Sequence, residues 1–464
     1  MHGGRLEMRP SACTTMHRSA AAALIVACGL LAVVRGEEGA AAAPGDLIPT
    51  TVAGFAGYTA YSDVDQHARV DRDIRSLEKA GDDWDAAKTI YEEGLHSTKS
   101  SGEKRTLKSF STKWASTAVA SEQSEPLVRL SHEFWGRGDY ADAHILAALD
   151  GRDLEGYGMY GSGKLAKQAA ARKQMVKKVV KFSAVWLYAL HEVESAVAKY
   201  KDESLGDARF GADGAAHALD EGWVFYAGSL EHGSQEDGEA DDSGMGYAPY
   251  VLAEKRAPAF KTDGYVLGNG GTSRVNLELL YQFTAMQRLL RTAGNEAQVE
   301  QSLKCIRAQF KIPVIQACLL YSHKASSPDL TDDDSLAKIK AEAWAFCSQA
   351  LPLLHEVDPA SAAAVKKTVM LDASDARPDW AIVRDAFSGE NVNGMGLKCS
   401  DVGALDDGVY QCRDTASLLS QNSYADSAVC GSVRMPNNPS SAAGTASSWI
   451  VVGLAAVLSV LGTH

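Results

Sequence analysis

The stretch His191-Glu192-Val193-Glu194 sets an imidazole and a carboxylate one helical turn apart, within a long segment of helical periodicity. Small and apolar side chains recur along this segment at gaps of three and four residues, the spacing that keeps them on one helix face. They are Val176, Val180, Ser183, Leu187, Leu190 and Val197. Glu194 takes the next place in that stripe, so we expect its carboxylate to face the core. Because an unpaired buried charge is very unfavourable, this carboxylate needs a cation, a proton or a strong donor.

A second amphipathic segment, residues 211–230, repeats the arrangement. His217 precedes Asp220 by three residues and Glu221 by four, so the three side chains lie on one side of a helix. If the two helices pack together, imidazoles and carboxylates from both converge on one point.

Imidazoles and carboxylates are ligands for iron in an oxidising compartment, and carboxylates favour its harder ferric form. The sequence therefore predicts an iron site, ferric or ferrous, between two facing helices. The predicted ligands are His191, Glu194, Glu221, Asp220 and His217. In the sharper form of this prediction Glu194 faces Glu221 across the bundle, with His191 at the rim. Glu192 lies at the wrong angle to join the stripe, so we expect it to be solvated.

Other interpretations of the same residues remain open. A His–Glu hydrogen bond would brace the core without any metal. His191-Glu192 also begins the His-Glu-x-x-His motif of zinc proteases, but the fifth position is Ser195, which removes one of the two histidine ligands. A metal-dependent hydrolase is therefore an alternative function, and a structural or adhesive surface protein without metal is another.

The segments that would carry these residues predict an all-α fold. Long stretches show helical periodicity and almost none alternate as strands do, which indicates a helical bundle, predicted to form two packed lobes. The predicted divisions are an N-terminal helical lobe at 60–150, a main bundle at 164–372, and an irregular, disulfide-held tail at 380–438. Pro313 and Pro352 are expected to kink or end their helices.

Both ends of the chain indicate export and attachment to a membrane. Residues 1–43 combine arginines, an apolar run at 20–34 and a small-residue segment, which is typical of a secretory signal peptide. Residues 440–464 combine small residues, a polar spacer and a hydrophobic tail, which is the order of a GPI-attachment signal. A short C-terminal membrane helix is the alternative. The predicted location is secreted, periplasmic or on the outer face of the plasma membrane.

Charge and cysteine usage agree with that location. The net charge of -13 argues against a nucleic-acid partner, because the phosphates would be repelled. Six cysteines follow the signal peptide, and an even number in a secreted chain predicts disulfides, one or more in the tail and one between helices. They are Cys305, Cys318, Cys347, Cys399, Cys412 and Cys430.

Several separated motifs, taken in order, resemble one family. They are Asp82-Asp83-Trp84-Asp85 with Ile90-Tyr91, His191-Glu192-Val193-Glu194, the stretch Asp220 to Tyr226, the stretch Tyr250 to Arg256, and Ile312-Pro313-Val314-Ile315-Gln316. Over roughly residues 64–402 the chain resembles the low-iron-inducible periplasmic proteins, the iron-assimilation proteins of algae. The His-x-x-Glu element is also locally similar to that of imelysin-like proteins, which were once assigned as peptidases.

The family resemblance implies iron binding outside the plasma membrane that feeds uptake, without a catalytic step. The shared motifs contain His191, Glu194 and Glu221, but their role as ligands is inferred from the physical chemistry above. The expected partners are iron ions and a membrane ferroxidase or iron transporter, with the membrane reached through the C-terminal anchor.

Overall fold

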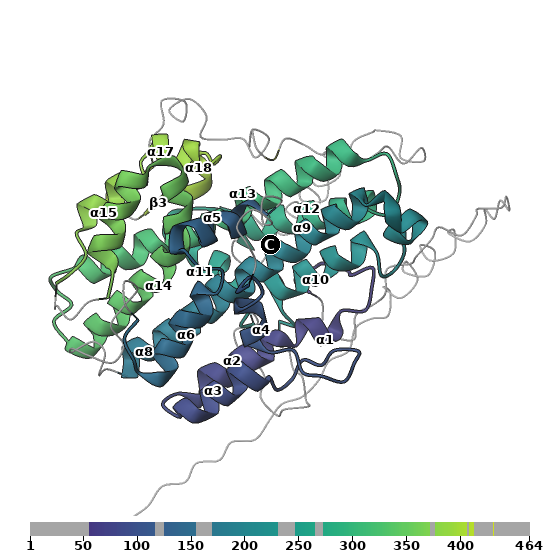
Figure 1. The fold of residues 1–464 in the computed structure, drawn as a ribbon. Coiled ribbons are helices and arrows are strands. Elements are labelled where there is room, and N and C mark those ends of the chain that lie inside the picture. The colour runs from purple at the N-terminus through teal and green to yellow at the C-terminus, as the bar shows by residue number, and fades with distance from the viewer. Residues whose placement is uncertain are drawn as a thin grey trace, which may run out of the picture. The chain divides into compact units, whose positions relative to one another are not determined.

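Figure 1 shows the computed structural model, which describes residues 55–116, 125–154, 169–230, 246–264, 272–371, 376–405, 408–412 and 430. All of the described residues fall within one compact unit, Gly45–His464. The predicted signal peptide and the predicted attachment signal lie outside the described residues. Among the residues that are described, no helix combines the length and the apolar character needed to span a bilayer. The division of the helices into two lobes stays a prediction.

The described part of the chain is mostly helical and has almost no strands, which confirms the all-α prediction. The first part contains α1 (Asp65–Ala68), α2 (Val70–Ala80), α3 (Trp84–Glu93), α4 (Leu107–Ser111), α5 (Pro126–Trp135) and α6 (Tyr140–Asp150). The middle part contains α8 (Ala169–Val179), the π-helix η2 (Val180–Val185), α9 (Trp186–Lys201), the 3-10 helix η3 (Glu203–Phe210), α10 (Ala215–Ala227), α11 (Tyr250–Phe260) and α12 (Arg274–Leu289). The last part contains α13 (Glu296–Ser326), α14 (Asp333–Val357), α15 (Pro359–Val369), α16 (Trp380–Ala386), α17 (Gly389–Gly394) and α18 (Cys399–Val402).

Strands are limited to two short antiparallel pairs within the described residues. β1 (Asp263–Gly264) pairs with β2 (Thr272–Ser273), with Asp263 opposite Ser273. β3 (Ala404–Leu405) pairs with β4 (Tyr410–Gln411), with Ala404 opposite Gln411. Neither pair is long enough to organise the core.

The long segment that carries His191 forms α8, η2 and α9 in unbroken succession. The stripe of small and apolar residues predicted to face the core is buried throughout, from Val176 to Val197. The π-helical turn at η2 was not predicted. Such turns are often found at functional sites, and this one buries Lys181, whose Nζ lies 2.5 Å from Oε1 of Glu78 on α2.

Helices α9 and α10 pack against each other, as the predicted site requires (Figure 1). Gly222 allows the close approach, because a Cβ there would lie 3.0 Å from the carbonyl oxygen of Ala189 and 3.0 Å from Cγ2 of Val193. A larger residue would push the two helices apart and displace its neighbour Glu221.

The disulfides follow the predicted distribution. Cys318–Cys347 joins α13 to α14, which is the bond expected between helices. Cys305–Cys430 and Cys399–Cys412 hold the C-terminal part of the chain, confirming a disulfide-held tail. Pro313 lies inside α13 and Pro352 inside α14, so neither proline ends its helix.

Candidate metal centre

The carboxylate of Asp220 on α10 is fully buried and surrounded by donors. Its Oδ1 accepts hydrogen bonds from the Tyr58 hydroxyl at 2.5 Å and from Nε2 of Gln287 at 2.9 Å. Its Oδ2 accepts from the backbone nitrogens of Tyr61 and Ser62 and from Oγ of Ser62, each at 2.8 Å. Burial raises the pKa of Asp220, and these hydrogen bonds oppose that rise. Asp220 thus fixes residues 58–62 on α10 rather than presenting free oxygens.

The Ser62 hydroxyl connects Asp220 to His217. Oγ of Ser62 donates its single proton to Asp220, while Nδ1 of His217 lies 2.7 Å from the same oxygen. Nδ1 must therefore be the donor in that contact, because the hydroxyl has no second proton to give. In the imidazolium Nε2 also carries a proton and donates it to Glu221, which raises the pKa of His217; in the neutral ring, the form that binds a metal, the lone pair lies on Nε2. Nε2 of His217 in turn lies 3.3 Å from Oε1 of Glu221.

His67, on the short helix α1, completes a cluster with His217 and Glu221. Nε2 of His67 lies 2.6 Å from Oε1 of Glu221, and the two imidazole rings meet edge to face with centroids 5.9 Å apart. One ligand atom from each of the three residues lies within 4.8 Å of the others, a geometry that a single metal ion can bridge. All three side chains are partly buried, so the cluster is largely shielded from solvent but still accessible to it.

Glu192 lies beside this cluster, and the prediction that it is solvated is wrong. Its side chain is buried and lies close to Tyr188 and Glu221. Burial, followed by the charge of Glu221, raises the pKa of Glu192 to about 7. Burial would also raise the pKa of Glu221, but hydrogen bonds from His217 and His67 outweigh it and lower that pKa. Glu221 is therefore ionised at neutral pH, whereas Glu192 changes its charge close to neutral pH.

Glu194 faces the core, as its place in the stripe predicted, and forms an ion pair with Arg307 on α13. Nε of Arg307 lies 2.6 Å from Oε1 of Glu194, and Nη2 lies 2.5 Å from Oε2, so the pair is bidentate. His191 pairs instead with Glu125, with 2.9 Å between Nδ1 and Oε2, and its ring meets Trp114 edge to face.

Of the five predicted ligands, the structure brings His217 and Glu221 together. Among the described residues, His191, Glu194 and Asp220 belong to no group whose ligand atoms converge on one point. His67 was missed, although Asp63 and Asp71 stand four residues on either side of it, because the four-residue helix α1 is too short to show an amphipathic pattern. Its partners in the cluster lie on α10, far along the chain, so local spacing does not identify them.

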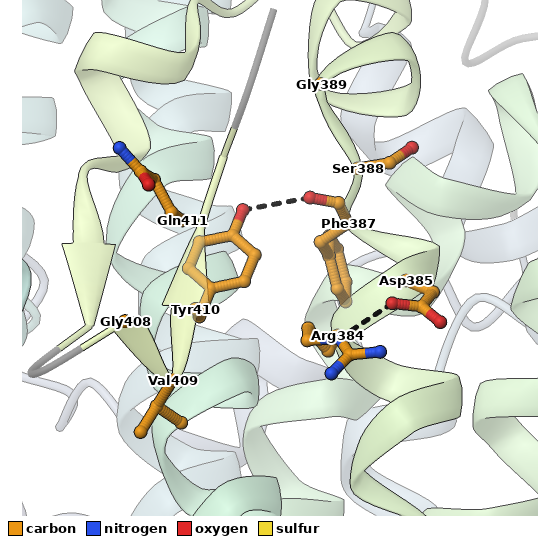
Figure 2. Close-up of a pocket in the computed structure, with 9 residues that line it drawn as sticks. All are labelled: Arg384, Asp385, Phe387, Ser388, Gly389, Gly408, Val409, Tyr410 and Gln411. Atoms are coloured by element: carbon orange, nitrogen blue, oxygen red, sulfur yellow. Dashed lines mark hydrogen bonds and ion pairs between the residues drawn. The ribbon is translucent and has the colours of Figure 1, made fainter.

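Two further features of the structure lie away from this cluster. Glu278, Cys305 and Cys430 also lie close together, but the disulfide between the two cysteines uses both sulfurs. A cavity of about 440 Å³ opens between α16, α17 and β4, where Tyr410 donates to the carbonyl oxygen of Phe387 and Arg384 pairs with Asp385 (Figure 2). None of the residues lining this cavity belongs to the predicted or observed ligand clusters.

A family model described as low iron-inducible periplasmic protein matches residues 28–419. The chain belongs to this family. The match covers every described helix and therefore both the His67–His217–Glu221 cluster and the Glu194–Arg307 pair. No curated protein and no solved structure matches the chain. Membership of the low iron-inducible periplasmic protein family confirms the resemblance seen in the motifs and indicates a location outside the plasma membrane.

The Glu194–Arg307 pair generates a prediction about stability. Glu194→Gln leaves Arg307 facing a neutral amide, so the free energy of unfolding should fall by about 2 kcal/mol, the scale of a charge-assisted hydrogen bond at a part-buried site. Chemical denaturation measures this. Glu300→Gln is the matched control, because the Lys201–Glu300 pair is exposed and should contribute less than about 0.5 kcal/mol. Equal effects of the two substitutions would contradict a structural role for Glu194.

Proposed function

We propose that this protein binds iron outside the plasma membrane and holds it for uptake, as cargo rather than as a resident cofactor. The observation that carries the proposal is the convergence of His67, His217 and Glu221 at the junction of α1 and α10. The family's description as low iron-inducible supports iron as the metal. The ligand set proposed here keeps His217 and Glu221 from the sequence prediction and adds His67.

The chemistry of the three side chains supports metal binding. Two imidazoles and one carboxylate form the ligand set that holds non-haem ferrous iron while leaving positions open for other ligands. Because the pKa of Glu221 is lowered, its carboxylate is ionised at neutral pH and ready to bind a cation. Glu192 supplies a second carboxylate beside the first, and a metal ion would favour its ionised form over the protonated one.

The surroundings of His217 support the same assignment. Metal-binding histidines usually donate their other ring nitrogen to a carboxylate, a carbonyl or a water, which fixes the ring and its tautomer. Here the hydroxyl of Ser62 accepts a hydrogen bond from Nδ1 of His217 and donates one to Oδ2 of Asp220. In this proposal Asp220, predicted as a ligand, instead orients one.

Holding iron for uptake requires release to a second protein. A membrane ferroxidase or iron transporter is the proposed partner, and a C-terminal membrane anchor would keep the protein near it. The same three donors also suit zinc, so the choice of iron depends on the family's induction by low iron.

Iron titration separates the proposed cluster from the residues first predicted. His67→Ala and Glu221→Gln each remove one of three ligands and should weaken binding by about 100-fold or more, which corresponds to about 2.7 kcal/mol. His191→Ala is the matched control and should stay within about threefold of the wild type, because His191 pairs with Glu125 instead. Calorimetry with ferrous iron under anaerobic conditions, and with ferric iron from a weak chelate, measures both. Loss of binding in His191→Ala alone would contradict the cluster, and a wild type that binds neither ion would refute the function.

The Ser62 hydroxyl provides a second prediction. Ser62→Ala removes the acceptor of the His217 Nδ1 proton, so the ring loses its fixed tautomer and iron affinity should fall about 10- to 100-fold. Ser111→Ala removes another buried hydroxyl, one bonded to Tyr91, and should leave iron affinity unchanged. If Ser62→Ala binds iron as tightly as the wild type, His217 is not oriented through this contact.

A further inference from the structure

Arg105 places a permanent positive charge among the proposed ligands. Its Nη2 contacts Nε2 of His67, the same nitrogen that lies 2.6 Å from Oε1 of Glu221. Burial lowers the pKa of Arg105, and the negative charges of Glu221 and Glu192 oppose that shift, which places the guanidinium near both carboxylates. Arginine remains protonated in proteins, so this charge does not disappear with pH.

The contact with His67 bears directly on metal binding. An imidazole nitrogen carries either a proton or a lone pair, and a guanidinium has donors only. Nε2 of His67 donates to Glu221 when it carries a proton and accepts from Arg105 when it does not, and in both cases the guanidinium occupies the position at Nε2 that a metal ion would need. Arg105 and a metal ion also share the same electrostatic partners, Glu221 and Glu192, so the presence of one disfavours the other.

We propose that Arg105 is a built-in competitor of the metal, and that its guanidinium must leave His67 before an ion can bind there. This inference rests on the proposed iron-binding function and concerns the regulation of that site. Arg105 lowers the affinity of the cluster, which favours release of the cargo to a partner. It also balances one of the two carboxylate charges, so the cluster can persist without a bound cation.

The loop between α3 and α4 is built so that the side chain of Arg105 can move while its backbone stays fixed. The backbone nitrogen of Arg105 donates to the carbonyl oxygen of Ser97 at 2.9 Å. Ser97 and Thr98 in turn bond to Gln66, the neighbour of His67 on α1. Beyond His67, the only hydrogen bond recorded for the guanidinium among the described residues is from Nη1 to the carbonyl oxygen of Thr98 at 2.9 Å. Rotation of the side chain therefore breaks few contacts.

The test compares iron affinity in a small series of variants, measured by anaerobic calorimetry with ferrous iron. Arg105→Gln keeps hydrogen-bonding capacity but removes the charge, so it should bind iron about tenfold or more tightly than the wild type. Arg105→Lys keeps the charge and should bind within about threefold of the wild type. Lys104→Gln is the matched control: it makes the same charge change one residue away, on an exposed side chain that contacts Thr98, and should leave affinity unchanged.

The outcomes separate this inference from the function on which it rests. If Arg105→Gln binds iron equally or less tightly, while His67→Ala still loses binding, the competitor role is refuted and the iron site stands. An equal gain in Lys104→Gln also refutes it, because general charge would then explain the effect. If neither the wild type nor Arg105→Gln binds iron, the proposed function fails and the inference falls with it. Circular dichroism of each variant checks that the fold is retained.

Discussion

The buried carboxylate of Asp220 is the constraint on which the rest of the site depends. Transfer of a carboxylate into the core is costly unless strong donors replace water, and Asp220 obtains five of them from Tyr58, Tyr61, Ser62 and Gln287. Most of these donors belong to the segment directly before α1. By gathering them, Asp220 holds that segment on α10 and so brings His67 to His217 and Glu221.

The same network explains how a site can form from residues far apart in the chain. Gly222 lets α10 lie close to α9, which puts Glu192 against Glu221. Ser62 sets the tautomer of His217, and the loop carrying Arg105 is tied to α1 through Gln66. Charge within the cluster is nearly balanced, with two carboxylates facing a guanidinium and two imidazoles. Competition between Arg105 and a metal ion is the behaviour that a metal site would show and a purely structural network would not.

Much of the fold could be predicted from the sequence because helical periodicity is local. The stripe from Val176 to Val197 and the burial of Glu194 both follow from side-chain spacing along one helix, whereas the packing of α9 on α10 was a condition of the predicted site. The partner of Glu194 could not be predicted in this way. A buried carboxylate requires a cation or a donor, but its position in one helix does not indicate which residue supplies it. Arg307 lies more than a hundred residues further along the chain.

Glu192 and His67 show why the site itself was harder to predict. A helix packed on more than one side buries more than a single stripe of side chains. Glu192 is therefore buried although it lies outside the stripe that contains Glu194. His67 lies on a helix too short to show periodicity, and its approach to α10 depends on contacts made by residues 58–62. Only the tertiary arrangement identifies these two residues.

The most direct test of the iron site is a crystal structure of the iron-loaded protein, with an anomalous difference map recorded at the iron edge. The account predicts one strong peak within coordination distance of His67, His217 and Glu221, with the guanidinium of Arg105 moved away from His67. A peak beside His191 and Glu194 instead, with the His67 cluster unchanged, would contradict it.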